Sequence, residues 1–285
     1  MALDLHCHTR ISDGSMGIEE LIATAKRRGL SAIAVTDHDA MAGATRAVMI
    51  GKRQGIEVVP GVEFSAMDNA RGQKVHILGY LCDSPDRLEG LCRKISAERR
   101  TAAAEMIRKV LRYYPIVPES ITRCAAGSTT IYKQHIMHAL MDAGYAPSIY
   151  GDIYDKLFSS ENGCARVSRS YPDAYEIIDL IHSAGGVAVI AHPAAYHNEA
   201  LLEELTEKKL IDGVEVWHPS HSEDEVRDLA AFAASHGLVA TGGSDFHGMY
   251  SRTPRPLGNS QVPEDTVRLL INCKNKRRRE ANAQK

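Results

Sequence analysis

The sequence predicts an α/β barrel of seven strands with a helical insert, and three observations support this prediction. Short apolar strands alternate with amphipathic helices over the first 85 residues, and the same alternation returns after residue 172. The region between them, roughly residues 86–171, contains several helical stretches and no strong strand. Strands that alternate with helices form mostly parallel sheets, which is the pattern of an α/β barrel.

The first alternating region supplies four of the predicted strands. They cover Leu3–His8, Ser31–Thr36, Ile56–Glu63 and Lys74–Leu81. One helix, Ile18–Arg28, carries its apolar residues on a single face and ends at Gly29. A second helix is predicted near Ala42–Gln54, and a polar turn at residues 68–72 joins the last two strands.

The second alternating region supplies the remaining three strands, at residues 186–191, 213–217 and 238–243. Helices are predicted over residues 173–183, 199–209, 222–236 and 263–273. The basic stretch that follows, residues 274–279, is interpreted as a solvated tail.

The helical middle of the chain is predicted to form a second domain. Its clearest helices are expected at residues 97–113 and 131–143. We therefore expect residues 1–90 and 172–285 to form the barrel, and residues 91–171 to form a helical insert that caps the active site.

Composition excludes several classes of protein. With a net charge of −2 and a pI near 6.7, the chain of 285 residues has no global basic surface, so nucleic acid is not expected as an obligatory partner. No apolar run approaches the roughly 18 residues of a membrane span, and the first residues lack the basic and apolar regions of a signal peptide. The six cysteines are scattered without a C-x-x-C pair, which predicts free thiols in the cytoplasm.

The thirteen histidines are the unusual feature of the composition. His6 and His8 lie two positions apart in a predicted strand, so both imidazoles face the same side. Such a pair at the carboxyl end of a strand can chelate one metal ion.

Every other predicted strand also carries a His, Asp or Glu near its end. These residues are His38, Glu63, His76, His192, His218, Asp245 and His247. Barrel enzymes place their active sites at the carboxyl ends of the strands. The pattern therefore predicts one active site built from all seven strands.

This set of donors predicts a metal centre. Imidazoles and carboxylates without thiolates suit Mn²⁺, Fe²⁺, Zn²⁺ or Mg²⁺, and the donors are too many for one ion. Glu63 can bridge two ions with its two oxygens. Two or three divalent ions, Mn²⁺ first among them, would activate water and stabilise the charge on a phosphoryl group.

Seven segments of the chain resemble the PHP (polymerase and histidinol phosphatase) family. They are HCHTRISDGS, VTDHDAMAG, PGVEFSA, VHILGY, IAHPA, DGVEVWHPSH and GSDFHG, in that order. Order and spacing are similar to those of the stand-alone PHP phosphoesterases with a helical insert. The resemblance implies a distorted seven-stranded barrel with a trinuclear metal site.

The resemblance also implies a ligand set. His6, His8, Glu63 and Asp245 would hold one ion, while Glu63, His76 and His192 would hold a second. Asp13, His38 and His247 would hold a third. Glu63, Asp245, His192 and His218 are the candidate catalytic residues, with His218 a proton donor to the leaving oxygen or a structural histidine.

The chain departs from nucleotide-acting relatives in two stretches that contact substrate in those proteins. An Arg-Pro-His stretch is replaced here by Lys133-Gln134-His135, and a Lys-Pro-Ala-Tyr-Val-Pro stretch by residues 163–168. The metal site is thus kept and the pocket altered. We expect a small phosphorylated substrate, with a ribose cyclic phosphate that is opened and then cleaved again as a strong candidate.

Five residues are candidates for substrate contacts. Arg166 and Arg169 could clamp a second phosphate, because arginine offers two parallel donors to phosphate oxygens. Arg10 follows the first strand closely. Lys133 and His135 are included because the resemblance aligns their stretch with substrate-facing positions.

Other functions remain open at this point. Within phosphoesterases, the alternatives are a phosphatase of AMP or 3′,5′-bisphosphonucleotides and a 5′–3′ exoribonuclease on short RNA. Amidohydrolases also combine an early H-x-H with later histidines and a late Asp, but Asp13 and Asp245-Phe246-His247 argue against that class. A metal-holding accessory module without activity is the last alternative.

Overall fold

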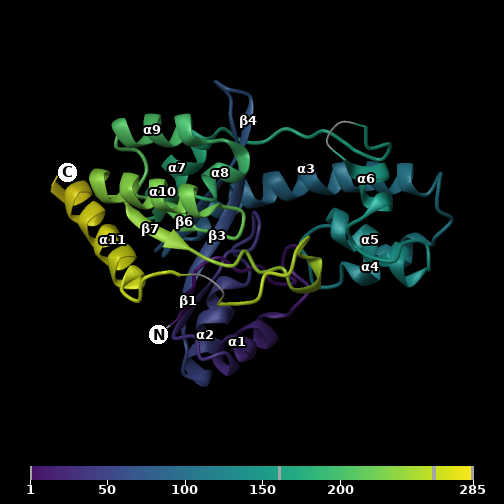
Figure 1. Cartoon of the computed structure of the whole chain (residues 1–285), viewed down its shortest axis with the longest axis horizontal. Helices are drawn as coiled ribbons and strands as arrows, with labels where there is room; N and C mark the ends of the chain where they lie inside the picture. The colour runs from purple at the N-terminus through teal and green to yellow at the C-terminus, as the bar shows by residue number, and fades with distance from the viewer. Residues whose placement is uncertain (1, 160–161, 259–260, 284–285) are drawn as a thin grey trace.

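The computed structural model describes residues 2–159, 162–258 and 261–283. Seven strands form one sheet in which each strand neighbours the next in chain order (Figure 1). The strands are β1 (Leu3–Asp4), β2 (Ala32–Val35), β3 (Glu57–Asp68), β4 (Gln73–Tyr80), β5 (Val187–Ile190), β6 (Gly213–Trp217) and β7 (Val239–Gly242). A parallel bridge between Cys7 and Phe246 joins the two edges, so the sheet nearly closes into a barrel. The predicted seven-stranded α/β barrel is confirmed.

One strand runs against the others. β4 pairs antiparallel with both β3 and β5, whereas all the other neighbouring strands are parallel. The turn at residues 69–72 is too short for the crossover that a parallel pair requires, so β4 must reverse. The reversal brings the amino-terminal half of β4, with His76, to the barrel end where the other strands finish.

Helices cover the outside of the barrel. They are α1 (Ile18–Arg27), α2 (Ala44–Gln54), α7 (Ala174–Ser183), α8 (Pro193–Tyr196), α9 (Glu199–Glu207), α10 (Glu223–His236) and α11 (Thr266–Ala283), with a short 3₁₀ helix at Gly248–Tyr250. The apolar face predicted for α1 is buried, as Leu21 and Ile22 show. Ser222 and Glu225 form a reciprocal capping box that starts α10 one residue inside the predicted boundary.

The last helix extends further than the sequence indicates. The basic stretch at residues 274–279 continues α11 and is not a separate tail, although residues 275, 276, 278 and 279 are exposed, as expected for a solvated stretch. Lys274 contacts Asp83 at 2.6 Å, and Arg277 contacts Asp212 at 2.7 Å and His182 at 2.8 Å. These ion pairs hold the helix against the end of the barrel opposite the strand carboxyl ends.

Within the residues that the structure describes, the insert contains four helices between β4 and α7: α3 (Asp86–Val110), α4 (Pro118–Cys124), α5 (Lys133–Asp142) and α6 (Asp152–Phe158). They pack around an apolar cluster that includes Ile121, Ile136 and Phe158, and Tyr250 of the barrel joins this cluster. Figure 1 shows these helices projecting to one side of the barrel, with the long α3 leading to them. The exact domain boundaries stay a prediction.

Two further observations concern the surroundings of the protein. Within the described ranges, no helix is both long enough and apolar enough to cross a bilayer. All six cysteines are free thiols.

Candidate metal centre

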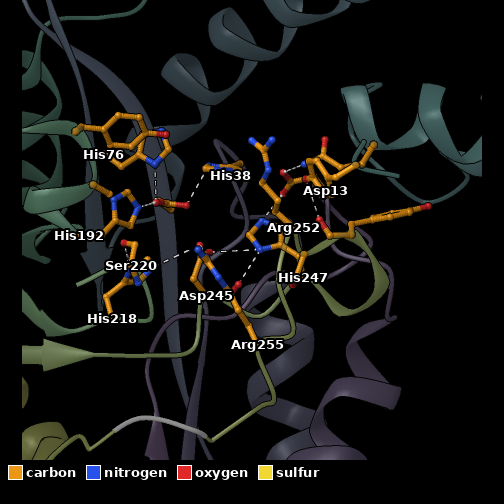
Figure 2. A pocket seen from close by; sticks show the side chains of 17 residues that line it. Asp13, His38, His76, His192, His218, Ser220, Asp245, His247, Arg252 and Arg255 are labelled. Carbon is orange, nitrogen blue, oxygen red and sulfur yellow. Dashed lines mark hydrogen bonds and ion pairs between the residues drawn. The ribbon is translucent and has the colours of Figure 1, made fainter. Parts of the chain in front are cut away.

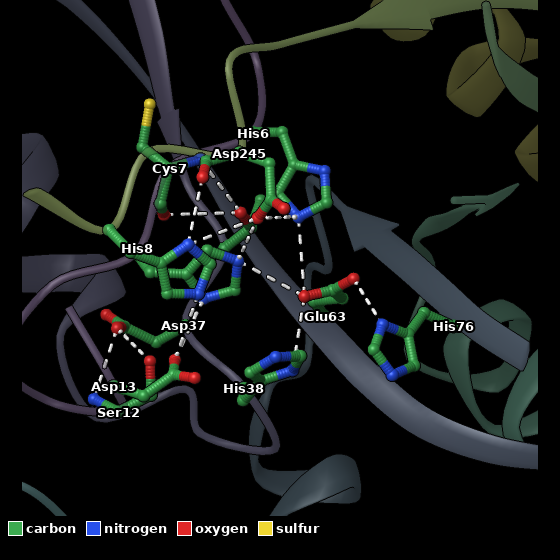
Figure 3. A network of polar contacts seen from close by, with 12 residues as sticks. His6, Cys7, His8, Ser12, Asp13, Asp37, His38, Glu63, His76 and Asp245 are labelled. Carbon is green, nitrogen blue, oxygen red and sulfur yellow. Dashed lines mark hydrogen bonds and ion pairs between the residues drawn. The ribbon is translucent and has the colours of Figure 1, made fainter. Parts of the chain in front are cut away.

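The two histidines that follow β1 reach the centre of the barrel mouth. Both imidazoles are fully buried. Nε2 of His6 lies 3.3 Å from Oε2 of Glu63, and Nε2 of His8 lies 3.2 Å from the same oxygen (Figure 3). The alternation of the strand therefore turns both rings toward one carboxylate, as the H-x-H spacing predicts.

Glu63 occupies the middle of the cluster. Its Oε2 also lies 3.1 Å from Nδ1 of His38. Its Oε1 lies 2.7 Å from Nδ1 of His76 and 3.0 Å from Nε2 of His192. Each oxygen thus faces a different group of imidazoles, which is the arrangement of a bridging ligand.

Two aspartates complete the cluster. Oδ1 of Asp245 lies 3.3 Å from Nε2 of His8 and 3.4 Å from Nδ1 of His247. Oδ1 of Asp13 lies 3.3 Å from Nε2 of His247 and 3.7 Å from Nδ1 of His8. The last strand and the loop after the first strand therefore meet above His8.

The donor atoms fit metal ions. Several of them are buried and have no hydrogen-bond partner within the described part of the chain, including Nε2 of His6, both ring nitrogens of His8, Nδ1 of His38 and Oδ1 of Asp13. Leaving buried polar atoms unpaired is costly, so such a cluster fits bound cations. All nine predicted ligands fall into groups whose donor atoms lie within 4.8 Å of one another.

The carboxylates of the cluster are held in their charged form. Burial alone would raise the pKa of Glu63, but His38, His76 and His6 bring it well below its ordinary value. The pKa of Asp245 is likewise lowered, because His247, His218 and His8 outweigh burial. Both groups are therefore anions, ready to bind cations.

The backbone at the strand ends is strained where it presents these side chains. Asp39, His192 and Asp245 have φ angles of 53°, 27° and 49°, a region that residues other than glycine rarely adopt. Gly243 faces a different constraint, because a Cβ atom there would lie 2.4 Å from the backbone nitrogen of His6. The first and last strands can approach this closely only with glycine at this position.

Glu215 of β6 supports the cluster and was not predicted. Its Oε1 lies 2.9 Å from Nδ1 of His6, and its Oε2 accepts a hydrogen bond of 2.9 Å from the backbone N–H of His192. The signal in the sequence is an acid in the middle of an apolar strand, GVEVW, where a carboxylate without a partner would be costly.

Two further aspartates brace the loops of the site. Asp4 accepts hydrogen bonds from the hydroxyl and the N–H of Ser244, next to Asp245. Asp37 accepts hydrogen bonds from the hydroxyls of Thr9 and Ser12, at 2.7 Å each, and so shapes the loop that carries Asp13.

Two cavities open on the cluster and share Asp13, His38 and His76. The first, of about 520 Å³, lies on the β7 side; its lining includes His218, Ser220, Arg252 and Arg255 (Figure 2). The second, of about 550 Å³, extends beneath the insert; its lining includes Lys74, Lys133, Arg166, Arg169 and Tyr171. The cluster therefore lies between two cavities, each of which is lined by positively charged side chains.

The structure separates the five predicted substrate contacts. Lys133, Arg166 and Arg169 line the second cavity. Arg10 is exposed, donates a hydrogen bond to the carbonyl of Ser15, and lines neither cavity. His135 also lines neither, because it is fully buried and its Nδ1 accepts the N–H of Tyr132 at the start of α5.

His218 lines the first cavity with a defined proton position. Its Nδ1 accepts the backbone N–H of Ser220 at 3.1 Å, so a neutral ring carries its proton on Nε2. This Nε2 lies 3.4 Å from Oδ2 of Asp245. Burial lowers the pKa of His218 to about 4, although Glu215 and Asp245 oppose the change.

Comparison with known proteins agrees with this geometry. The model of the PHP domain family matches residues 4–188. A phosphoribosyl 1,2-cyclic phosphate 1,2-diphosphodiesterase from Eggerthella lenta is 38% identical over 89% of this chain and 97% of its own. A 5′–3′ exoribonuclease from Haemophilus influenzae is 31% identical over 86% of this chain and 89% of its own.

A solved structure from Bifidobacterium adolescentis, assigned as a metal-dependent phosphoesterase, superposes with a TM-score of 0.85. It is 29% identical, and the match covers 95% of this chain and 96% of that one. The family match covers the first four strands and the insert and reaches the start of β5, and the Eggerthella lenta relative matches over nearly its whole length. The chain belongs to the PHP domain family and is a metal-dependent hydrolase of phosphate esters.

Proposed function

We propose that the chain opens a ribose 1,2-cyclic phosphate that carries a second, remote phosphate, and then cleaves the resulting monoester to release inorganic phosphate. The observation that carries this proposal is a group of four cations in the second cavity, Lys74, Lys133, Arg166 and Arg169; a fifth cation of its lining, Arg99, is paired with Asp39. The name of the Eggerthella lenta relative, a phosphoribosyl cyclic phosphate diesterase, supports the same substrate.

Two of these cations lie against the ring of Tyr171. Arg169 lies over the ring of Tyr171, 4.6 Å from its centroid, and Nζ of Lys74 lies 5.4 Å from the same centroid. Burial and the nearby Lys74, Arg166 and Arg169 lower the pKa of Lys133, so the cations repel one another. Among the described residues that line this cavity, Asp13 is the only carboxylate, and it belongs to the metal cluster. An anionic group of the substrate would relieve this repulsion.

The metal centre would be built by the nine predicted ligands. We propose that His6, His8, Glu63 and Asp245 hold one ion, that Glu63, His76 and His192 hold a second, and that Asp13, His38 and His247 hold a third. Mn²⁺ is the first candidate, with Fe²⁺, Zn²⁺ or Mg²⁺ as alternatives, because the donors mix imidazole with carboxylate. When bound, the ions would activate water and neutralise charge on the phosphoryl group.

The chain's own residues provide a hydrogen-bond donor and the orientation. His218 presents Nε2–H to the first cavity, in reach of an oxygen that leaves phosphorus near Asp245. Because Nδ1 accepts the N–H of Ser220, the ring is neutral, and His218 can donate its Nε2–H as a hydrogen bond that stabilises charge on the leaving oxygen. Glu63 and Asp245 keep the imidazoles in place through the contacts described above.

The cation group also explains how two ester bonds can be cleaved in one site. After the first cleavage the product keeps its remote phosphate, and Arg166 and Arg169 would hold it beside the centre. A held intermediate reacts again faster than one that must rebind, because its orientation is already fixed.

Two alternatives within the phosphoesterases are tested by the same experiment. One is a phosphatase of AMP or 3′,5′-bisphosphonucleotides, and the other is an exoribonuclease on short RNA, the activity in the name of the Haemophilus influenzae relative. A net charge of −2 favours a small substrate over a long polyanion. We further propose a cytoplasmic location, since all six cysteines are free thiols.

The decisive experiment is a phosphate-release assay with the Mn²⁺-loaded protein. The panel contains phosphoribosyl cyclic phosphate, ribose cyclic phosphate without the remote phosphate, AMP, a 3′,5′-bisphosphonucleotide, histidinol phosphate and short RNA. We expect the doubly phosphorylated sugar to give the highest kcat/KM, with a ring-opened monoester visible before phosphate appears. Preference for nucleotides or RNA would contradict the proposal.

A pair of variants tests the role of the cation group. Arg169→Gln is expected to raise KM for the doubly phosphorylated sugar about 10- to 100-fold, the worth of one charged hydrogen bond. Hydrolysis of p-nitrophenyl phosphate, which lacks a remote phosphate, should change less than about twofold. Lys52→Gln on the exposed face of α2 is the matched control, and both of its values should equal those of the wild type.

A further inference from the structure

Arg255 lies against the metal cluster in the segment that follows β7. Its guanidinium contacts Oδ2 of Asp245, and its side chain is 21% exposed toward the first cavity (Figure 2). No other residue in the described ranges forms a hydrogen bond or an ion pair with this side chain, and its buried Nε–H has no partner. An arginine has five N–H groups, so most of its donors remain for another acceptor.

The backbone around Arg255 is rigid. Pro254 and Pro256 flank it, and proline fixes its own φ angle while restricting the residue before it. Two residues later Leu257 is buried, and the N–H of Gly258 donates to Asp4 at 2.7 Å. These restrictions on the backbone fix the position of the guanidinium beside the cavity.

The need to neutralise the charge of Asp245 does not explain why Arg255 lies beside it. Oδ1 of Asp245 faces His8 and His247, while Oδ2 faces Arg255 and His218. Four carboxylates, those of Asp13, Glu63, Glu215 and Asp245, lie at the centre, and the four positive charges of two divalent ions already balance them. A permanent cation beside them therefore weakens metal binding unless an anion also enters.

We propose that Arg255 is a catalytic residue that donates hydrogen bonds to the phosphoryl oxygens of the substrate while its contact with Asp245 holds it in place. In this step water adds its oxygen to phosphorus and loses a proton, the bond from phosphorus to the ester oxygen breaks, and that oxygen takes up a proton. Arg255 stays protonated throughout and stabilises the charge that accumulates on the phosphoryl oxygens.

The proposal rests on the phosphoester chemistry of the proposed function and not on its sugar. Its test therefore uses p-nitrophenyl phosphate as substrate and inorganic phosphate as inhibitor, with the full chain loaded with Mn²⁺. Failure of the sugar substrate would appear only in the substrate panel, and failure of Arg255 would appear only here.

The variants are Arg255→Gln and Arg255→Lys, with Arg227→Gln on the exposed face of α10 as the matched control. We expect Arg255→Gln to lower kcat/KM about 100- to 1,000-fold and to raise the inhibition constant of inorganic phosphate at least about tenfold. Arg255→Lys should recover only part of this loss, because an ammonium cannot reproduce the planar fork. Metal content, measured by mass spectrometry, should stay at the wild-type value in both variants.

Two results would overturn the proposal. If metal content falls in proportion to activity, Arg255 acts only by positioning Asp245. If the inhibition constant of inorganic phosphate is unchanged in folded, metal-loaded Arg255→Gln or Arg255→Lys, the guanidinium does not contact the phosphoryl group. Arg255→Gln and Arg255→Lys are assessed independently. If one of them misfolds, the other still tests the proposal.

Discussion

Nδ1 of His6 lies 2.9 Å from Oε1 of Glu215, a residue 209 positions later in the chain. Burial opposes the charged form of Glu215, but His6 and His218 bring its pKa down to about 2. The carboxylate therefore accepts the Nδ1–H of His6, and the lone pair of Nε2 is left to face Glu63 and Asp245. Such a partner fixes both the tautomer and the orientation of a metal-binding imidazole.

Replacing this partner should weaken metal binding. In Glu215→Ala we expect the affinity for Mn²⁺ to fall about 10- to 100-fold, because His6 loses the acceptor that fixes its ring. Titration against a fluorescent chelator measures the change. Glu223→Gln, on the exposed start of α10, is the control and should bind Mn²⁺ as the wild type does. Unchanged affinity in Glu215→Ala would show that neighbouring side chains orient His6 without it.

The close approach of the first and last strands gives a second prediction. Gly243→Ala would place a methyl group 2.4 Å from the backbone nitrogen of His6 and 2.4 Å from its Cβ. The strands must separate, which we expect to lower the free energy of unfolding by about 1–3 kcal/mol and to reduce metal content. Gly90→Ala in α3 meets no atom within 4 Å and should be neutral or stabilising. Urea unfolding and metal analysis of both variants check this, and equal stability of the two would contradict it.

Acid stability should depend on Asp212. Burial would raise its pKa, but His182, the N–H of Ala188 and Arg277 lower it below the ordinary value of 3.8. A lowered pKa in the folded state stabilises the protein above pH 3.8 and loses this effect as the pH falls through the lower folded value.

Asp212→Asn is therefore expected to be about 1–3 kcal/mol less stable than the wild type at pH 7, with the difference shrinking below about pH 4. Urea unfolding at several pH values measures both effects. Asp228→Asn, whose side chain is 73% exposed, serves as the control. A difference that stays constant down to pH 3 would show that the charge of Asp212 is not what stabilises the contact.

His218 gives a prediction that depends on the leaving group. If Nε2–H donates a hydrogen bond to the leaving oxygen, His218→Gln should lower kcat about 100-fold or more for a sugar ester, whose leaving alkoxide is strongly basic. The same variant should lose less than about tenfold on p-nitrophenyl phosphate, because nitrophenolate leaves unprotonated. His236→Gln, at the exposed end of α10, is the control. An equal loss of kcat on both substrates would show that His218 has a structural role.

Removal of the metal ions should cost both activity and stability. The cluster buries imidazole nitrogens that have no hydrogen-bond partner among the residues the structure describes, and bound cations would satisfy them. Ions present at a hundredfold excess over their Kd contribute about 2.7 kcal/mol to the free energy of unfolding, and a chelator should remove this contribution. Thermal unfolding before and after dialysis, with restoration by Mn²⁺, checks it. Full activity in a sample shown to be metal-free would contradict the metal centre.

The local pattern of apolar and polar residues predicted the elements of the barrel well. Strand and helix periods depend on neighbouring residues, so α1, β2 and β6 lie within one or two residues of their expected bounds. The length of β3 was underestimated, because its continuation to Asp68 depends on pairing with β4. The end of α11 was also missed, since its basic residues look solvated until Asp83 and Asp212 are placed beside them.

The sequence by itself determined which residues could bind metal: a donor stands at the end of every strand, and parallel strands bring their ends together. Only the tertiary structure decided which residues surround them. It brought Glu215 and Arg255 to the centre, seated His135 in a helix cap and left Arg10 outside both cavities. Periodicity reports which face of an element a residue occupies, but contacts between residues far apart in the chain depend on how the elements pack.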